Sequence, residues 1–451
     1  MQSHVIDEIR WSWNAYEHYA WGYDELLPIS RKPGQSKVCG GVGVMILDSI
    51  DTLYMAKLEK EYDNAKKWIS FNFSKYKHRT NSVVVFEVTI RALGGLLSAY
   101  ALTSDELYKV KAIELGLKLL PAFNKHTGLP SNRINLQTGK TFDSRSLCVA
   151  EVGTLHLEFT YLSHISGDER FLRSACKAEK WLLRIAHRAK PRYILSSDVT
   201  TNGYLYGRKS VGAGVDSYYE YLLKYWLQTG RKSQWMLNFY RNTSDAIHKH
   251  LIKQIGNTTI SVSYKYNTYE MGHLDCFLPG MLALGSYYDY EWKHSGRDMN
   301  TAKMLLETCW KLYSHSKSVG AESLILRKHK VRIKNPINLL RPEVAESLYI
   351  LWKVTGNKIY KKRAWIMFKK YRLHSRVTTG GYSTISDVNN PTFSDKMETF
   401  WVAETLKYLY LTLSDYNLDM NTWVLNTEAH PLPVINNMRR CSNPFYKKKS
   451  L

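Results

Sequence analysis

The sequence predicts an all-α protein made of repeated helical hairpins. Apolar residues recur at helical spacing over long segments such as 83–99 and 218–227, whereas the alternating pattern of β-strands is scarce. Only 12 of the 451 residues are proline, and no linker rich in Gly, Ser and Pro divides the chain. We therefore expect one folded domain over residues 1–434 and a basic C-terminal tail over residues 435–451.

Short polar turns interrupt the helical segments at nearly constant intervals. Successive turn residues lie 63, 63, 66, 60 and 59 positions apart, and an earlier helix break falls at Leu58-Glu59. The glycines suit helix C-caps, and the neighbouring Asp, Asn or Ser suits the N-cap of the next helix. This spacing predicts seven helical hairpins, which either stack as an open solenoid or close into a ring. The turn residues are Ser104, Gly167, Gly230, Gly296, Gly356 and Asp415.

The length of the chain favours the ring. A chain of 451 residues exceeds the ~250–300 residues at which an ordinary single core stops growing. Two concentric helix layers around one core remove this conflict. A ring would also gather long loops such as 200–216 at one mouth, and loops of this length usually carry function.

The formal net charge of +23 is the strongest compositional signal. Such an excess of Lys and Arg is typical of nucleic-acid-binding proteins, which are one alternative for this chain. However, the basic segments 326–334 and 358–372 fall in loop and outer-helix parts of the repeats, and no base-stacking motif accompanies them. We therefore expect a solvated basic surface and no nucleic-acid partner.

We expect neither a membrane span nor a signal peptide in this sequence. No apolar run approaches the ~18–20 residues that cross a bilayer, and residues 1–16 have the pattern of an amphipathic helix. Any targeting or anchoring segment would then lie outside this chain. Three glycosylation sequons begin at Asn72, Asn242 and Asn257, a number close to chance.

The six cysteines include no C-x-x-C pair, which argues against a zinc site. Their spacing alone leaves buried thiols and disulfides both open.

Glu87 lies inside the apolar segment 83–90. A buried carboxylate without a partner is costly, so Glu87 must be paired, protonated or functional. A pair with Arg91, four residues on, is the structural alternative. Apolar surroundings would help Glu87 to keep its proton, and Arg91 would oppose this.

Glu343 follows Arg341-Pro342 and precedes a helical segment that also holds Glu346. Proline favours the first turn of a helix, so Glu343 should lie at the positive end of the helix dipole. That setting keeps a carboxylate ionised, as a general base requires. A simple preference for acidic residues at helix starts is the alternative.

Three further segments carry candidate polar residues. Asp216 ends a glycine-rich loop and opens the helix 217–227, where helix capping is the alternative to function. Residues 395–398 resemble a capping box, which would account for Glu398. Residues 426–431 interrupt extended flanks and are typical of a hairpin tip.

Taken together, these motifs resemble glycoside hydrolase family 47, the class I α-1,2-mannosidases that trim N-glycans. The matching stretches run in order from residue 21 to residue 433, about nine-tenths of the chain. They are WGYDEL at 21–26, LDSIDTL at 47–53, VFEVTIR at 85–91, GGLLSAY at 94–100, AEVGT at 150–154, DSYYEYLLK at 216–224, GHL at 272–274, LRPE at 340–343, KMETF at 396–400 and NTEAHP at 426–431.

The resemblance implies an all-α (αα)7 barrel with a C-terminal β-hairpin that plugs it, and an inverting, calcium-dependent exo-α-1,2-mannosidase. It implies that Glu87 is the catalytic acid, that Glu343 is the base and that Asp216 is a third catalytic carboxylate. Ca²⁺ would bind Thr427 through its hydroxyl and backbone carbonyl, and Cys276 would pair with Cys309 in an oxidising compartment. The implied substrate-binding residues are Arg91, Glu151, His273, Arg341, Pro342, Glu346, Glu398 and Glu428.

The chain departs from the family pattern at a few positions. Members restricted to one glycan branch carry an arginine two residues before the catalytic Asp, where this chain has Gly214. This difference predicts broader trimming. The other departures are Cys148, His156, Asn335 and Ile337, and none of them removes a catalytic carboxylate.

By this resemblance, the expected substrates are high-mannose N-glycans of the Man9GlcNAc2 type, processed by a monomer in the lumen of the endoplasmic reticulum or Golgi. The alternative from another class is a mannosidase-like lectin that recognises misfolded glycoproteins for degradation. The presence of all the acid, base and calcium positions argues against a pure lectin.

Overall fold

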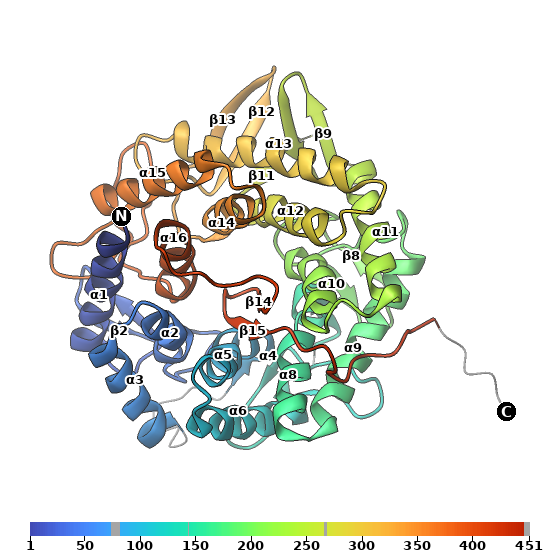
Figure 1. Ribbon diagram of the computed structural model, residues 1–451, viewed down its shortest axis with the longest axis horizontal. Coiled ribbons are helices and arrows are strands. Elements are labelled where there is room, and N and C mark those ends of the chain that lie inside the picture. The colour runs from blue at the N-terminus through green and yellow to red at the C-terminus, as the bar shows by residue number, and fades with distance from the viewer. Residues whose placement is uncertain (74–81, 143, 266–267, 446–451) are drawn as a thin grey trace. The chain divides into compact units, whose positions relative to one another are not determined.

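The computed structural model describes residues 1–73, 82–142, 144–265 and 268–445. These residues fall into two compact units. The first unit comprises Met1–Thr80 and Leu251–Asp419, and the second comprises Asn81–His250 and Met420–Leu451. Both units consist mainly of α-helices that follow one another in pairs, with short strands between the pairs (Figure 1).

Helices of the first unit alternate between two kinds. Helices α2, α12, α14 and α16 are buried on nearly all sides, whereas α3, α13 and α15 bury one face and expose the other. A helix that is apolar all round needs cover on every side, which amphipathic neighbours provide. The helices are α1 (Gln2–Tyr19), α2 (Val44–Met55), α3 (Glu59–Asn72), η4 (Leu274–Phe277), α12 (Leu278–Tyr288), α13 (Ser295–Ser314), α14 (Glu343–Thr355), α15 (Lys358–His374), η5 (Trp401–Thr405) and α16 (Leu406–Leu413).

The second unit repeats this alternation. Helices α8 and α10 are buried nearly all round, and the 20-residue α9 has one apolar and one charged face. The helices are α4 (Val85–Glu87), η2 (Val88–Leu93), α5 (Gly94–Thr103), α6 (Glu106–Leu119), η3 (Leu120–Ala122), α7 (Val149–Gly153), α8 (His156–Ser166), α9 (Glu169–Arg188), α10 (Asp216–Gln228) and α11 (Gln234–Leu251), whose last residue belongs to the first unit.

The predicted turns are largely confirmed. Asp105, Asp168 and Asn357 each accept a hydrogen bond from the backbone N–H two residues on, as N-caps of α6, α9 and α15. Gly167 and Gly356 end their helices in the left-handed region, with φ of +74° and +67°. The predicted break at Leu58-Glu59 separates α2 from α3.

Two turn predictions were wrong. Gly296 does not end a helix but lies in the first turn of α13, because the preceding helix α12 already stops at Tyr288. Asp415 follows the end of α16 but no helix restarts there, since the chain becomes extended at Ser414. Helix α16 packs instead against α1, from the other end of the sequence (Figure 1). The last hairpin is therefore closed by tertiary packing rather than by a local turn.

Short antiparallel strands lie in the long connections. Many of them end where a buried helix begins: β3 precedes α4, β6 precedes α7, and β11 ends immediately before His273. The first unit holds β1 (Glu25–Leu27), β2 (Lys32–Gly34), β9 (Ile252–Ile255), β10 (Thr258–Ser261), β11 (Glu270–Gly272), β12 (Ser323–Arg327) and β13 (Lys330–Asn335). The second holds β3 (Val83–Val84), β4 (Arg133–Ile134), β5 (Thr141–Phe142), β6 (Ser146–Cys148), β7 (Asp198–Thr200), β8 (Leu205–Tyr206), β14 (Trp423–Leu425) and β15 (Pro431–Pro433).

Each sheet lies within one unit, although β3-β4, β6-β7 and β11-β12 join segments about 50 residues apart in the sequence. The sheets are β1-β2, β9-β10 and β11-β12-β13 in the first unit, and β3-β4-β5, β6-β7-β8 and β14-β15 in the second. The predicted hairpin tip at 426–431 is confirmed, because Leu425 pairs with Pro431 in the β14-β15 ladder. This hairpin packs against α5 and α10 of its own unit (Figure 1).

The helical stretch Val85–Thr103 corrects one sequence-based expectation. It has the length and apolar composition of a membrane span, although 67% of it is buried inside the structure. It also carries Glu87 and Arg91, which face protein partners. We therefore interpret this stretch as a core helix.

The structure contains two disulfides. The predicted bond between Cys276 and Cys309 is present, and a second bond, which the sequence left open, joins Cys176 of α9 to Cys441 near the C-terminus. Cys39 and Cys148 do not belong to a disulfide in the described part of the chain. The described part of the basic tail, up to residue 445, is therefore tied to its unit rather than left loose.

Candidate active site

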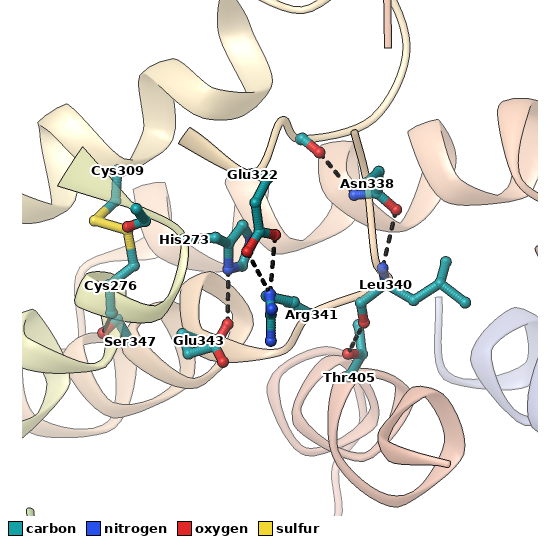
Figure 2. A network of polar contacts seen from close by, with 12 residues as sticks. His273, Cys276, Cys309, Glu322, Asn338, Leu340, Arg341, Glu343, Ser347 and Thr405 are labelled. Carbon is teal, nitrogen blue, oxygen red and sulfur yellow. Dashed lines mark hydrogen bonds and ion pairs between the residues drawn. A yellow bond between two sulfur atoms is a disulfide. The ribbon is translucent and has the colours of Figure 1, made fainter. Parts of the chain in front are cut away.

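In the first unit, the predicted base Glu343 is the first residue of the buried helix α14, with Pro342 at the cap position. This confirms the placement inferred from the Arg-Pro-Glu motif. The carboxylate Oε2 of Glu343 lies 2.7 Å from Nδ1 of His273, which follows strand β11 (Figure 2). Nε2 of His273 lies 3.1 Å from the hydroxyl of Tyr313.

The environment of Glu343 favours its ionised form. Burial alone would raise the pKa of this carboxyl, but the hydrogen bond and positive potential of His273 and the nearby Arg341 outweigh it, so the pKa of Glu343 is lowered. The start of a helix adds the positive end of the helix dipole. A carboxylate that stays ionised can accept a proton from water, so the site supplies a general base.

The side chain of Arg341 is held by an ion pair with Glu322. Its Nε lies 2.9 Å from both carboxylate oxygens of Glu322, which immediately precedes β12 (Figure 2). The sequence did not single out Glu322. Its signal, an acidic residue directly before an apolar strand, is too common to be recognised without the fold.

The loop before Glu343 has a constrained backbone. Leu340 has a φ of +62°, which is unusual for a residue with a side chain. Its N–H donates to the side chain of Asn338 at 3.0 Å, and its carbonyl accepts from the hydroxyl of Thr405 at 2.6 Å (Figure 2). These bonds hold the chain that leads into Arg341 and Glu343.

Glu346 is buried one turn after Glu343 on α14, as the motif spacing implies. Glu398 forms an ion pair with Lys396 at 2.9 Å. The capping-box interpretation of residues 395–398 was wrong. Asp395 has a φ of +49°, and its carboxylate accepts from the N–H of Ile29 at 2.7 Å, whereas the next helical segment begins only at Trp401.

In the second unit, Arg91 bridges two predicted site residues. Its Nε donates to Oε2 of Glu87 at 2.8 Å, and its Nη1 contacts Oε1 of Glu428. The side chain of Glu87 is 22% exposed and that of Glu428 only 3%. The structural alternative for Glu87, a pair with Arg91, is therefore confirmed. It does not compete with function, because the pair leaves part of the Glu87 carboxylate accessible.

Glu151 belongs to the same unit and lies on the short helix α7. The pKa of Glu151 is raised, mainly by burial and also by the negative charges of Glu87 and Asp198. The hydrogen bond from Nδ2 of Asn132, at 2.5 Å, opposes this shift. Asn132 was not predicted. It comes from a connection that is not helical, and no periodic pattern marks it.

Asp216 is the first residue of α10 and not its N-cap, which is Val215. Its Oδ1 accepts from the N–H of Ser217 at 2.9 Å. Gly214, two residues earlier, has a φ of +85°, and a Cβ placed there would lie 3.0 Å from Cβ of Ser197. A side chain at position 214 is therefore disfavoured by this backbone.

Asn426 organises the tip of the β14-β15 hairpin. Its Oδ1 accepts from the N–H groups of Glu428 and His430, at 2.9 and 2.8 Å. Its Nδ2 donates to the carbonyl of Ile90 at 3.0 Å and to Glu158 at 2.8 Å. These hydrogen bonds of Asn426 fix the backbone of the tip, which includes the neighbouring Thr427. Sequence reasoning identified the motif but not this function of its first residue.

Buried charged residues lie beneath this tip. Tyr221 donates to Glu158 at 2.6 Å, and burial raises the pKa of Glu158 to about 7, partly offset by the bonds from Tyr221 and Asn426. Glu220 forms an ion pair with Lys224 one turn later on α10. The DSYYEYLLK motif contains three of these residues, and a helical wheel would have shown that they share a polar face.

Thr427, at the tip of the β14-β15 hairpin, is the residue that the family resemblance assigns to Ca²⁺. Among the described residues, no three His, Cys, Asp or Glu side chains gather as a metal-binding group. The backbone N–H of Thr427 lies 3.4 Å from the hydroxyl of Tyr221, and its own hydroxyl forms no hydrogen bond with a described residue. Thr427 thus offers its hydroxyl and its backbone carbonyl as two hard oxygen donors. These donors fit a calcium ion that takes most of its 6–8 ligands from water and substrate.

Comparison with known proteins identifies the family of this chain. Residues 8–434 match the model of glycosyl hydrolase family 47. The chain is 35% identical over 457 residues to the human endoplasmic reticulum mannosyl-oligosaccharide 1,2-α-mannosidase. The matched region covers 96% of this chain and 64% of that relative. The chain is 36% identical over 448 residues to the human mannosyl-oligosaccharide 1,2-α-mannosidase IC, which covers 95% of this chain and 70% of the relative. The chain thus spans about two-thirds of the length of these relatives.

Among solved structures, the α-1,2-mannosidase from Trichoderma reesei superposes with a TM-score of 0.88 at 26% sequence identity, covering 96% of this chain and 99% of the other. This match confirms the predicted (αα)7 fold class. The chain therefore belongs to glycosyl hydrolase family 47, a family of glycosidases.

Proposed function

We propose that this protein is an inverting exo-α-1,2-mannosidase that removes α-1,2-linked mannose from high-mannose N-glycans. The observation that carries this proposal is the placement of Glu343 at the start of α14, with its carboxylate 2.7 Å from Nδ1 of His273, a contact that lowers the pKa of Glu343. Both relatives described above are named mannosyl-oligosaccharide 1,2-α-mannosidases, which supports the linkage and the sugar in this proposal.

Glu343 acts as the general base in this proposal. It takes a proton from a water molecule, which attacks the anomeric carbon on the face opposite the leaving oxygen. Glu87 acts as the general acid and protonates that oxygen, so the anomeric configuration inverts. His273 positions Glu343 through its hydrogen bond, and Arg91 fixes the carboxyl of Glu87. Asp216 is the third catalytic carboxylate.

The other predicted residues bind the sugar. We assign mannose binding to Arg91, Glu151 and Glu428 of the second unit and to His273, Arg341, Pro342, Glu346 and Glu398 of the first. Thr427 would hold Ca²⁺, which, when bound, supplies a positive charge that orients the mannose hydroxyls. Asn426 keeps Thr427 in place from the protein side.

We infer that the protein works in the lumen of the endoplasmic reticulum or Golgi. Two disulfides support an oxidising compartment, and the first matched relative is named for the endoplasmic reticulum. Gly214 supports trimming of more than one branch, because a small residue there leaves room for different glycan arms.

The decisive experiment is release of mannose from a Man9GlcNAc2 oligosaccharide, followed by NMR identification of the first anomer released. We expect β-mannose, and we expect release to stop with a chelator and return with Ca²⁺. Glu343→Gln should lower kcat by ~10²–10⁴-fold. Glu307→Gln is the matched control, because the side chain of Glu307 on α13 is 56% exposed and forms an ion pair with Arg363, which is not assigned to the site.

The outcomes separate the alternatives. Retention of the α-anomer would overturn the inverting mechanism. Activity that survives both the chelator and Glu343→Gln would overturn the assigned base and metal. Glycan binding without any release of mannose would support the lectin.

A further inference from the structure

A small aromatic cavity lies between α1 and α3 of the first unit, and none of its residues is assigned to the active site. It has a volume of about 360 Å³. This is the size of a small-ligand site, at the low end of the ~300–1,000 Å³ found for such pockets. Its lining residues are Glu17, Trp21, Asn64, Lys67, Trp68, Phe71 and Asn72.

Three aromatic rings supply the apolar part of this cavity. Phe71 is 66% exposed, which is unusual for a phenylalanine and leaves its ring open to a ligand. Trp68 is packed firmly from behind, because a Cβ on Gly43 would meet its ring at 2.4 Å and one on Gly22 would meet its Nε1 at 2.9 Å. Trp21 is held by Trp13 in an edge-on contact with ring centroids 5.8 Å apart. Both indole rings are therefore pre-positioned.

Polar groups at the edge of the cavity are also fixed in advance. Nδ2 of Asn64 donates to Oε1 of Glu17 at 2.7 Å, which joins α3 to α1. This bond leaves the amide oxygen of Asn64 and the second carboxylate oxygen of Glu17 as acceptors. Lys67 and Trp21 donate no hydrogen bond to another described residue, so two donors of the lining are available to a ligand, whereas the Nε1 of Trp68 lies on the edge packed against Gly22.

The charge of the lining narrows the ligand class. One carboxylate, Glu17, balances one ammonium group, Lys67, although the whole chain carries +23. A neutral lining of this kind does not select anions. A purely apolar ligand would remove water from Glu17 and Asn64 without replacing their hydrogen bonds, which is costly. The chemistry that fits is a neutral ligand with one apolar face and hydroxyls around its edge.

We propose that this cavity is a second carbohydrate-binding site, which takes a hexopyranose unit outside the catalytic residues. The C–H face of the sugar would lie on the rings of Trp68 and Phe71. Its hydroxyls would accept from Lys67 and the indole N–H of Trp21 and donate to Asn64 and Glu17. Since the choice of mannose among hexoses rests on the proposed function, a terminal mannose of an N-glycan is the intended occupant.

The test uses the full chain produced in bacteria, so that the sequon at Asn72 carries no glycan. The probe is methyl α-D-mannopyranoside, followed through the indole N–H resonances of Trp21 and Trp68 by NMR. We expect saturable shifts of both resonances. Phe71→Ala should weaken this binding by about fivefold or more. Asn64→Leu, which keeps the side-chain size but removes the amide, should do the same.

Tyr290→Ala is the matched control, because Tyr290 is also highly exposed in the first unit but does not line the cavity. It should leave the shifts unchanged. None of these variants should change the rate of mannose release from a short substrate, since no substituted residue belongs to the proposed active site. The comparison should be made only for variants whose circular dichroism and melting temperature match the parent chain.

The proposal is overturned if the two indole resonances do not move with the sugar. It is also overturned if they move equally in Phe71→Ala, Asn64→Leu and the parent chain, or if only apolar ligands such as indole bind. This result is independent of catalysis. A chain that releases no mannose but shows the predicted variant effects would refute the proposed function and leave the second site standing.

Discussion

His273 connects Glu343 to Tyr313 through its two ring nitrogens. Nδ1 lies 2.7 Å from Glu343, and Nε2 lies 3.1 Å from the tyrosine hydroxyl. With Glu343 ionised, Nδ1 of His273 donates to the carboxylate. Tyr313 in turn contacts the hydroxyl of Tyr371 at 3.0 Å, so the orientation of the imidazole is set from behind.

This arrangement predicts a shifted pH profile for His273→Ala. Loss of the hydrogen bond to ionised Glu343 raises the pKa of the carboxyl, so the base stays protonated to a higher pH. The acid limb of kcat/KM against pH should therefore move to higher pH, in addition to any loss of rate. Tyr313→Phe, which keeps the imidazole and removes only its second partner, should move this limb less. An unshifted acid limb in His273→Ala would show that His273 does not tune the base.

Arg91→Met should destabilise the protein as well as inactivate it. Arg91 pairs with Glu87 and with the nearly fully buried Glu428, so its loss removes a positive charge that both carboxylates contact. Breaking a buried pair in this way lowers the free energy of unfolding by about 3–5 kcal/mol. Urea unfolding of the parent chain and of Arg91→Met would measure this loss. Arg91→Lys, which keeps the charge but not the two-sided geometry, should retain part of this stability. An unchanged unfolding midpoint in Arg91→Met would contradict the bridging function.

Glu179→Gln should make the protein more stable at pH 8. Glu179 is buried beside His156, 3.5 Å away, yet burial raises the pKa of Glu179 to about 8 and lowers that of His156 to about 3. Both groups are then neutral at pH 7, and the contact is not an ion pair.

The sign of this effect follows from proton binding. The folded state binds the Glu179 proton more tightly than the unfolded state does. The stability that this proton binding gives the folded state is therefore complete below about pH 4 and is lost as the pH rises towards 8. The parent chain should lose stability over this range by up to ~1.4 kcal/mol per pH unit from this group. Urea unfolding at pH 5 and pH 8 should show a smaller difference for Glu179→Gln than for the parent.

Cys441→Ser should lower the free energy of unfolding by ~2–4 kcal/mol. The bond to Cys176 joins residues 265 positions apart, so its loss frees a long loop in the unfolded chain and releases the C-terminal segment from α9. Thermal unfolding and limited proteolysis would detect the two effects. Ser442→Ala, which removes only the contact with Lys180, is the control for the segment itself. Equal melting temperatures for parent and Cys441→Ser would show that this disulfide does not stabilise the fold.

The sequence by itself determined the features that depend on neighbours a few residues apart. The caps at Asp105, Asp168 and Asn357 were predictable because an N-cap bond spans only two residues. The start of α14 at Glu343 followed from the preceding proline for the same reason. The ordered motifs then identified the family and the candidate site residues.

Only the tertiary structure decided the relationships that join distant segments. Arg91 is shared between Glu87, four residues away, and Glu428, 337 residues away, and only the first pair was visible in the sequence. The pairing of Cys176 with Cys441, the packing of α16 on α1 and the grouping of Trp21, Trp68 and Phe71 around one cavity are of the same kind. Local patterns set which residues share a helix face, but which distant faces then meet depends on the packing of the whole core, and no spacing in the sequence records that.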